Sequence, residues 1–401
     1  MVHLLNPWMK GLFLSKDFLL WHKHKLIERM FQMTKVIQTA PYRVDHVGSL
    51  LRPEILKSSR SAFEKGEISK SQLKNIEDQE IKRIIEKQKE IGLKAITDGE
   101  FRRGWWHLDF MWGINGMEKY RKEHGYKFAG DIESEPLDVR TIDKISWNKN
   151  HEFLDHFKFL QNFVGEDAVS KFSIPSPNQF LHEGIRRNEH YPTIELFCKD
   201  LRKVYNEAIQ DFYDLGCRYL QIDDVFWGFL AADGIKDELI LEEEWELLKK
   251  MAKENIQDII YNKPEDLTLT THVCRGNYRS SYAAAGPYYP VAKELFEEIS
   301  YDGYFLEYDD DRSGDFGPLK YFTGKGKIVL GLMTSKFPEL EDVEVLKARI
   351  NEAAKYVPKS QICISPQCGF ASTEEGNILT EEEQWKKLAH LVDHVNTLFA
   401  D

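Results

Sequence analysis

The sequence predicts a (β/α)8 barrel, and three observations support this fold class. From residue 43 onward, short apolar runs that end in Gly, Ser, Asp or Pro alternate with longer stretches of helical periodicity. Several runs are continuously apolar, as expected for parallel strands that are covered on both faces. Eight runs occur in a chain of 401 residues, which suits a closed barrel. A doubly wound open sheet is the alternative for the same alternation.

The predicted strands are runs rich in apolar and β-branched residues that end at turn-forming residues. In chain order they are Arg43–Gly48, Lys94–Asp98, Lys171–Ile174, Tyr219–Asp223, Leu267–Val273, Gly303–Glu307, Lys327–Met333 and Gln361–Ser365. Because barrel strands run parallel, the residues at their carboxyl ends are expected to meet at one face.

The stretches between these runs carry the periodicity of amphipathic helices. The clearest is Ser69–Ile91, which places Leu73, Ile76 and Ile84 near one face and stops at Gly92. The other predicted helices are His151–Phe163, Ile194–Leu215, Leu241–Ile260, Pro290–Ile299, Val343–Tyr356 and Thr380–Phe399. No Walker loop and no G-x-G-x-x-G follows the first run, so the sequence lacks a nucleotide-binding fingerprint.

The domain organisation that we expect is a single catalytic barrel over residues 33–401 with a long insertion after the second strand. The insertion covers about 101–170, contains four tryptophans, and would form a lid or one side of an active-site mouth. Residues 1–32 are expected to be a poorly ordered N-terminal extension, because Met33 begins a more ordinary start. The sequence indicates no particular oligomeric state.

Composition excludes several classes of function. A formal net charge of −12 argues against nucleic-acid binding. The N-terminal region lacks both an apolar run of membrane-spanning length and a small-residue cleavage site, so neither membrane insertion nor secretion is expected. Five cysteines are too few for a disulfide scaffold, and their odd number favours free thiols in a reducing cytoplasm.

Four candidate metal ligands lie near the ends of three of the last four predicted strands: His272, Cys274, Glu307 and Cys368. Two thiols, an imidazole and a carboxylate suit zinc. His272 and Cys274 are two residues apart and therefore face the same side of an extended strand. The wide spacing to Glu307 and Cys368 is wrong for a zinc finger but fits a site assembled from several strands. Such a site can bind and ionise a substrate thiol.

Other polar residues at strand ends suggest an amino-acid pocket. Glu100 and Asp223 follow the second and fourth strands and are candidate catalytic residues, since two carboxylates can hold an ammonium group. Ser49 follows Val47 and Gly48, where the glycine lets the backbone approach a ligand closely. The Ser49 hydroxyl and neighbouring N–H groups could hold a carboxylate.

The ordered set of these motifs resembles the catalytic barrel of cobalamin-independent methionine synthase. The resemblance spans roughly residues 40–400. The segments that carry it are Val47-Gly48-Ser49, Asp98-Gly99-Glu100, Gln221-Ile222-Asp223, Thr271-His272-Val273-Cys274, Glu307 and Pro366-Gln367-Cys368-Gly369. The family has two barrels and this chain has room for one, so it is similar to a single-barrel relative.

The resemblance implies a zinc-dependent S-methyltransferase that makes methionine from homocysteine without cobalamin. His272, Cys274, Glu307 and Cys368 would bind zinc, which would take the homocysteine sulfur. Glu100 and Asp223 would take the ammonium group, and Val47, Gly48 and Ser49 would surround the carboxylate. The donor would be 5-methyltetrahydrofolate if the activity is that of a 5-methyltetrahydropteroyltriglutamate–homocysteine methyltransferase.

Two departures from the family leave the donor open. Its Ile-His-Ser segment reads Met333-Thr334-Ser335 here, so the histidine that would protonate a leaving amine is absent, with His107, His182 or His190 as substitutes. Its Asn-Trp segment, associated with folate stacking, is replaced by residues 174–177, and Trp105, Trp106 or Trp227 would have to stack instead. A corrinoid protein or a small methylated compound are the other donors.

Three further functions compete with homocysteine methylation. The first is alkyl transfer to another small thiol on the same barrel. The second is metal-assisted hydrolysis, which two cysteine ligands and the lack of an obvious additional base disfavour. The third is a non-catalytic barrel that binds zinc and homocysteine.

Overall fold

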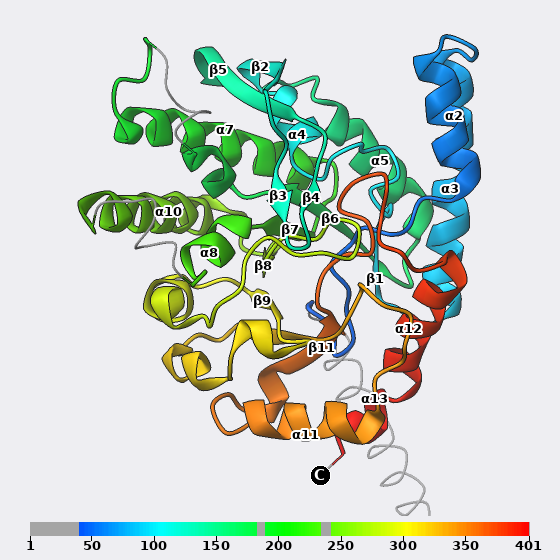
Figure 1. Ribbon diagram of the computed structural model, residues 1–401, viewed down its shortest axis with the longest axis vertical. Helices are drawn as coiled ribbons and strands as arrows, with labels where there is room; N and C mark the ends of the chain where they lie inside the picture. The colour runs from blue at the N-terminus through cyan, green and yellow to red at the C-terminus, as the bar shows by residue number, and fades with distance from the viewer. Residues whose placement is uncertain (1–39, 183–188, 234–241, 401) are drawn as a thin grey trace, which may run out of the picture.

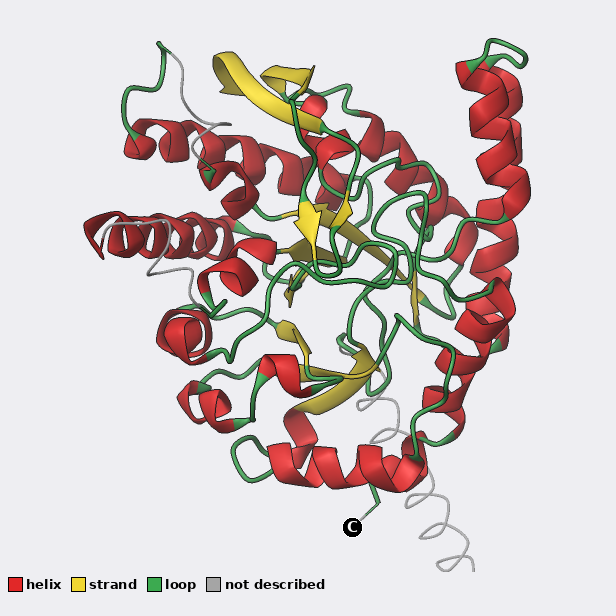
Figure 2. Ribbon diagram, viewed as in Figure 1, coloured by secondary structure: helices red, strands yellow, loops and turns green. Residues whose placement is uncertain are grey.

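A computed structural model describes residues 40–182, 189–233 and 242–400 as an α/β fold with strands at the centre and helices around them (Figures 1 and 2). The predicted extension at 1–32 lies outside the described residues. Seven parallel strands form one curled sheet in the order β1-β6-β7-β8-β9-β10-β11. The predicted barrel class is thereby confirmed.

The strands of this sheet lie close to the predicted runs. They are β1 Ala95–Ile96, β6 Val169–Pro175, β7 Tyr219–Asp223, β8 Thr268–Val273, β9 Gly303–Glu307, β10 Lys327–Met333 and β11 Ile362–Pro366. The register pairs Asp223 at the end of β7 with His272 on β8, so these two side chains start as neighbours.

The prediction of a regular strand at Arg43–Gly48 is wrong. This segment lies between the sheet edges β1 and β11, where it makes a single parallel bridge from Val44 to Ile364. The Asp45 carboxylate accepts hydrogen bonds from the backbone N–H groups of Tyr42 and His46. Because a side chain satisfies these donors, the segment does not build a ladder to β1.

Ten α-helices are described in the residues that the structure covers. They are α2 Glu54–Glu64, α3 Lys70–Glu90, α4 Leu108–Trp112, α5 Glu152–Val164, α7 Ile194–Asp214, α8 Val225–Leu230, α10 Glu242–Asn262, α11 Val343–Ala353, α12 Glu381–Asp393 and α13 Val395–Leu398. Ser69 and Thr380 form capping boxes at the starts of α3 and α12. Helix α2 was not predicted, although Pro53 immediately precedes it.

Two predicted helices differ in form. Pro290–Ile299 is a short 3-10 turn, η3 Tyr289–Val291, followed by a single π-helical segment, η4 Lys293–Glu298. Pro290 is the second residue of the turn, and Ile299 has extended backbone angles that end the segment. The predicted helix Thr380–Phe399 is divided between α12 and α13 at His394.

The connection from β1 to β6 contains α4, α5 and two small antiparallel sheets. Strand β2 (Asn115–Arg121) pairs with β5 (Leu137–Ser146), and β3 (Lys127–Phe128) pairs with β4 (Ile132–Glu133). The β3–β4 hairpin is fixed to the loop after β8, since the Ala129 N–H donates to the Tyr282 carbonyl at 2.8 Å. In Figure 1 this hairpin lies near the centre of the view, in front of the barrel strands.

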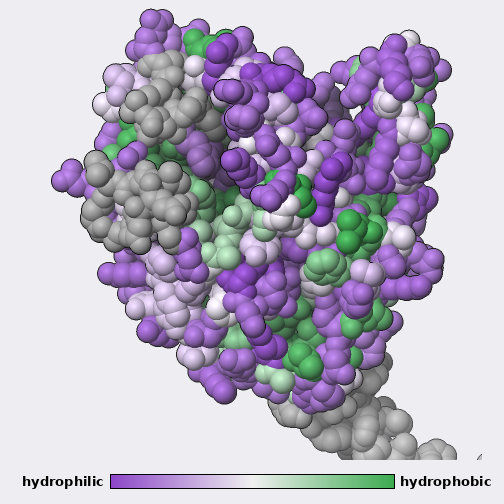
Figure 3. All heavy atoms as spheres, viewed as in Figure 1, coloured by the Kyte–Doolittle hydropathy of each residue, from purple (hydrophilic) through white to green (hydrophobic). Residues whose placement is uncertain are grey.

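The barrel interior holds both apolar and charged groups. Lys171 and Asp45 form a fully buried ion pair at 3.1 Å, below a small cluster that includes Phe305 and Val329. The face shown in Figure 3 is mostly hydrophilic, with hydrophobic residues gathered in separate groups toward its centre and right. Among the described helices, none has the length and apolar character that a membrane span requires.

Candidate active site

The four predicted metal ligands come together at the carboxyl ends of the strands. His272 lies on β8, and Cys274 is the first residue after that strand. Glu307 ends β9, and Cys368 lies two residues after β11. All four are buried, and their candidate ligand atoms lie within 4.8 Å of one another. Residues that are 96 positions apart in the chain therefore form one cluster.

The geometry and chemistry of this cluster fit zinc. The Sγ atoms of Cys274 and Cys368 are 3.5 Å apart, and both thiols are free. Two sulfurs on a tetrahedral zinc would lie about 3.8 Å apart, given zinc–sulfur bonds of about 2.3 Å. The two Sγ atoms need to separate by only a few tenths of an ångström to accept the ion.

Neighbouring groups orient the ligands and set their charge. Glu307 accepts a hydrogen bond from the Arg275 N–H at 2.7 Å and pairs with Arg312 at 2.6 Å. Burial raises the pKa of Glu307, but the surrounding positive charges, Lys336 and Arg312 first among them, lower it by more than burial raises it. The net shift is downward, so the carboxylate is ionised. A hydrogen bond from Cys274 lowers the pKa of Cys368 and favours its thiolate.

His272 is held by two contacts at the base of the cluster. Its Nδ1 is 3.4 Å from Asp223 Oδ1, and its Nε2 is 3.1 Å from the Gln367 carbonyl oxygen. Burial alone would lower the pKa of His272, but Cys368 and Asp223 raise it. Asp223 thus touches a candidate ligand as well as facing the cavity described below.

Glycines permit close approaches behind two of the ligands. A Cβ at Gly369 would lie 1.8 Å from Ser49 Oγ, so the residue after Cys368 must lack a side chain. A Cβ at Gly228 in α8 would lie 2.2 Å from the Cys274 carbonyl oxygen. Gly369 therefore allows Ser49 to lie beside the cysteine cluster.

The predicted amino-acid pocket lies beside this cluster. Glu100 accepts a hydrogen bond from Ser173 at 2.8 Å and pairs with Arg103 at 3.3 Å through Oε1, while its buried Oε2 has no hydrogen-bond partner among the described residues. Burial raises the pKa of Glu100 to about 7, opposed by Arg103 and assisted by Asp223. An unpartnered carboxylate oxygen in this position can accept a ligand's ammonium group.

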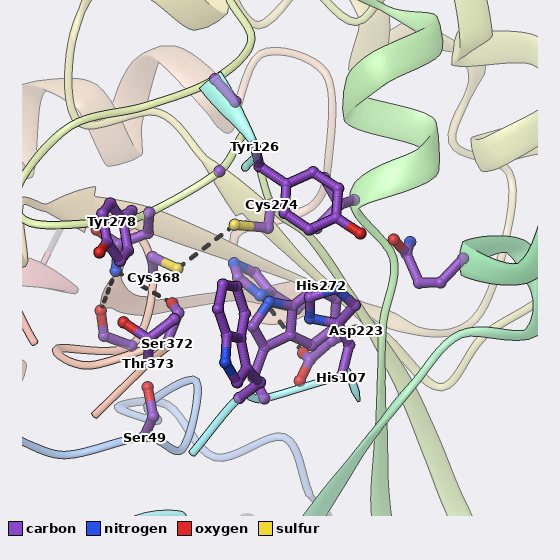
Figure 4. Close-up of a pocket in the computed structure, with 18 of the residues that line it drawn as sticks. Ser49, His107, Tyr126, Asp223, His272, Cys274, Tyr278, Cys368, Ser372 and Thr373 are labelled. Carbon is purple, nitrogen blue, oxygen red and sulfur yellow. Dashed lines mark hydrogen bonds and ion pairs between the residues drawn. The ribbon is translucent and has the colours of Figure 1, made fainter. Parts of the chain in front are cut away.

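One cavity of about 310 Å³ joins both groups of residues. Its floor contains Val47, Ser49, Glu100, Asp223, His272, Cys274 and Cys368. Figure 4 shows the two sulfurs facing each other, with His272 and Asp223 joined by an ion pair. Gly48 and Glu307 do not line the cavity: the Gly48 carbonyl accepts from Thr97, and Glu307 lies beneath the surface.

Aromatic side chains form another part of the lining, which we call the aromatic wall: Trp105, Trp106, His107, Tyr126, Phe128 and Tyr278. Three loops supply it. Backbone pairing fixes Trp105 and Trp106 to residues 372–373 of a fourth loop, and stacking of Phe128 on Tyr278 at 5.1 Å joins the hairpin to the loop after β8.

The structure separates the histidines and tryptophans that the sequence left open. His107 and His182 line the cavity, as do Trp105 and Trp106. His190 lies elsewhere, 3.3 Å from Asp143. Trp227 is fully buried and outside the lining. The sequence also gave no indication that Tyr126, Phe128 and Tyr278 belong to the site, because their positions depend on loop docking.

Fold and site together define an α/β-barrel protein with a ligand cavity above a zinc-suited cluster. Residues 44–394 match the family described as "Cobalamin-independent synthase, Catalytic domain", so the chain belongs to this family. The resemblance seen in the sequence is thereby confirmed.

Among its relatives, the uncharacterized protein YxjH of Bacillus subtilis is 45% identical over 370 residues, which cover 92% of this chain and 97% of YxjH. A methionine synthase of Pyrococcus abyssi is 23% identical, with coverage of 87% and 90%.

Two solved structures share the fold. A Listeria monocytogenes protein, provisionally assigned as a vitamin-B12 independent methionine synthase, matches with a TM-score of 0.73 and 42% identity over 91% of this chain and 100% of that one. A B12-independent methionine synthase of Shewanella, in complex with selenomethionine, matches with a TM-score of 0.66 over 88% and 97%. At 17% identity, the Shewanella likeness concerns the fold alone.

Proposed function

We propose that this protein is a zinc-dependent methyltransferase that transfers a methyl group to the thiol of homocysteine and forms methionine. The observation that carries the proposal is that one cavity contains both a two-thiol metal cluster and an unsatisfied carboxylate. A small amino acid with a terminal thiol can reach both at once. Membership of the cobalamin-independent synthase family supports the same reaction.

The chain's own residues would bind the amino-acid end of homocysteine. Glu100 Oε2 and the Asp223 carboxylate accept hydrogen bonds from its ammonium group, and the Ser49 hydroxyl donates to its carboxylate. Gln221 donates to Asp223 Oδ1 at 2.7 Å and to the Val47 carbonyl at 2.8 Å, which holds two parts of the floor in place. These contacts would direct the side-chain thiol toward the cysteine pair.

His272, Cys274, Glu307 and Cys368 would hold zinc, which lowers the pKa of a substrate thiol so that it reacts as a thiolate near neutral pH. The sulfur then attacks the donor's methyl carbon in line with the bond that breaks. The protein's contribution is to fix the two reactants at contact distance and exclude water from them. The aromatic side chains that line the cavity would contribute to this exclusion.

The acceptor half of this proposal is tested without any donor. Homocysteine added to the zinc-loaded protein should shift the zinc X-ray absorption spectrum toward more sulfur ligation. Homoserine, which carries a hydroxyl in place of the thiol, is the matched control and should leave the spectrum unchanged. An identical spectrum with and without homocysteine would refute thiol binding at the metal.

A further inference from the structure

The aromatic wall of the cavity makes none of the contacts proposed for homocysteine. Homocysteine is anchored on the floor, whereas the wall presents six aromatic rings. Three of these rings lie next to one another on the lining: the centroid of His107 is 6.1 Å from those of both Trp105 and Tyr126, which are 6.4 Å apart, and the rings are tilted or edge-on to one another. Aromatic rings that border one cavity can form a cage for an onium group, because their faces are electron-rich.

Cationic side chains are scarce around this cavity. Among the described lining residues, Lys127 is the sole lysine or arginine, and it is exposed to solvent. Two nearby cations are already paired: Arg103 with Glu100 at 3.3 Å and Lys122 with Asp138 at 2.9 Å. The Lys122 ammonium also lies 3.8 Å from the centroid of Tyr126, over its ring. A donor with several carboxylates would find no buried positive group.

His107 adds no positive charge to the wall. Burial lowers the pKa of His107 to about 3, so the imidazole is neutral near pH 7. Its enclosed Nδ1 has no hydrogen-bond partner among the described residues. The ring is therefore a neutral member of the cage, and it is a poor proton donor for a leaving amine.

We propose that the methyl donor is a small methyl-onium compound, a methylsulfonium or a quaternary methylammonium, held by Trp105, His107 and Tyr126. This inference rests on the proposed function, because it names the second substrate of the same reaction. The cavity of about 310 Å³ is at the lower end of the range for ligand pockets, which suits two small molecules.

The reaction balances without any other participant. The homocysteine thiolate forms a new sulfur–carbon bond to the methyl group. The bond between that carbon and the donor's positive sulfur or nitrogen breaks, and its electron pair returns to the heteroatom. The products are methionine and a neutral thioether or tertiary amine. The leaving group needs no proton, in keeping with the neutral His107.

The apolar wall would also accelerate this transfer. An anionic thiolate and a cationic donor lose their charges as the methyl group moves, so the transition state carries less charge than the reactants. An environment of low polarity disfavours the separated charges more than the transition state. The lining of aromatic rings is thus suited to a reaction in which opposite charges neutralise.

The test uses the full-length, zinc-loaded protein with homocysteine and three donors in separate reactions. Trimethylsulfonium represents the sulfoniums, glycine betaine the quaternary ammoniums, and 5-methyltetrahydropteroyltriglutamate the amine donors. Saturable formation of methionine from one of the onium donors supports the proposal and identifies the heteroatom. Methionine formed from the pteridine alone overturns the inference while leaving the proposed function intact.

Variants of the wall test the cage itself. Trp105→Leu should raise KM for the onium donor by roughly tenfold or more, since the cation–π contact is lost. Trp105→Phe should restore most of that affinity, and KM for homocysteine should hardly move in either variant. Equal donor KM values for the Leu and Phe variants would overturn the cage. If no donor gives methionine, the donor inference fails. The zinc X-ray absorption spectrum with homocysteine then tests the acceptor half of the proposed function separately.

Discussion

The floor of the cavity consists of strand ends, whereas the aromatic wall consists of loops that dock on one another. His272 on the floor and Glu307 beneath it are fixed by parallel strands whose register is continuous from β7 to β10. The wall is fixed by a few contacts, such as the 5.1 Å stacking of Phe128 on Tyr278. Strand ends are rigid, so they can hold a metal-ligand geometry to within tenths of an ångström.

This difference suggests how the two halves divide the reaction. In the proposed reaction, the floor would provide the charged groups and thiols that an amino-acid thiol needs, in a position set by the barrel. The wall provides aromatic surface on connections that can change without altering the sheet. Acceptor specificity is therefore expected to depend on the floor and donor specificity on the wall.

The largest effect should come from removing a floor ligand. Cys368→Ala leaves three ligands, and we expect loss of zinc together with a fall in methyl transfer of at least about a thousandfold. Zinc content by mass spectrometry and methionine formation measure the two losses. Cys363→Ala is the matched control, because Cys363 is also a buried cysteine, the second residue of β11, but lies outside the cluster. A Cys368→Ala protein with full zinc occupancy would contradict the ligand assignment.

A smaller effect is expected at the amino-acid contacts. Glu100→Gln keeps the shape but removes the charge, and methionine should bind roughly tenfold to a hundredfold more weakly by calorimetry. Arg103 retains its bond to the Ser173 carbonyl at 2.7 Å, so the fold should persist. Asp224→Asn is the control: this buried carboxylate binds Ser176 and Asn178 outside the cavity. Equal losses of methionine affinity in both variants would point to a general structural effect.

The same carboxylate predicts a pH dependence. Burial raises the pKa of Glu100 to about 7, and only its ionised form pairs with an ammonium group. Methionine has no titrating thiol, and its amine stays protonated between pH 6 and 8. Its affinity should therefore increase as pH rises toward 7, by at most about tenfold per unit, and level off above. In Glu100→Gln this slope should disappear; a slope that persists there would assign it to another group.

The sequence predicted the floor because its residues lie at or near the ends of predictable strands. A strand that ends in His272-Val273-Cys274 places both ligand atoms on one side, and the barrel brings Glu307 and Cys368 to the same face. The exception was Arg43–Gly48, where the Asp45 side chain accepts hydrogen bonds from backbone N–H groups that would otherwise be available for strand pairing. Such hydrogen bonds from the backbone to a side chain depend on the folded geometry, which a pattern of apolar residues does not predict.

The wall could not be predicted to the same depth. Tyr126 and Phe128 lie in a hairpin of very short strands, and they reach the cavity because Ala129 and Tyr282 join their backbones at 2.8 Å. Partners 153 residues apart in irregular loops leave no periodicity in the sequence. Trp105 and Trp106 were recognised as candidate stacking residues, but the choice between them and Trp227 required knowing which side chains are exposed to the cavity.

The smallest effect tests whether the wall is independent of the floor. Phe128→Leu keeps an apolar side chain but loses the stacking on Tyr278, which is worth about 0.5–1.5 kcal/mol. Amide hydrogen exchange should increase across the β3–β4 hairpin and remain unchanged in β8, and KM for the methyl donor should rise by roughly twofold to tenfold. Tyr120→Leu, in the same connection but away from the cavity, should change neither quantity. A change in KM for homocysteine as large as that for the donor would show that wall and floor act as one unit. In that case, loosening the hairpin would have displaced groups that the strand ends are expected to hold by themselves.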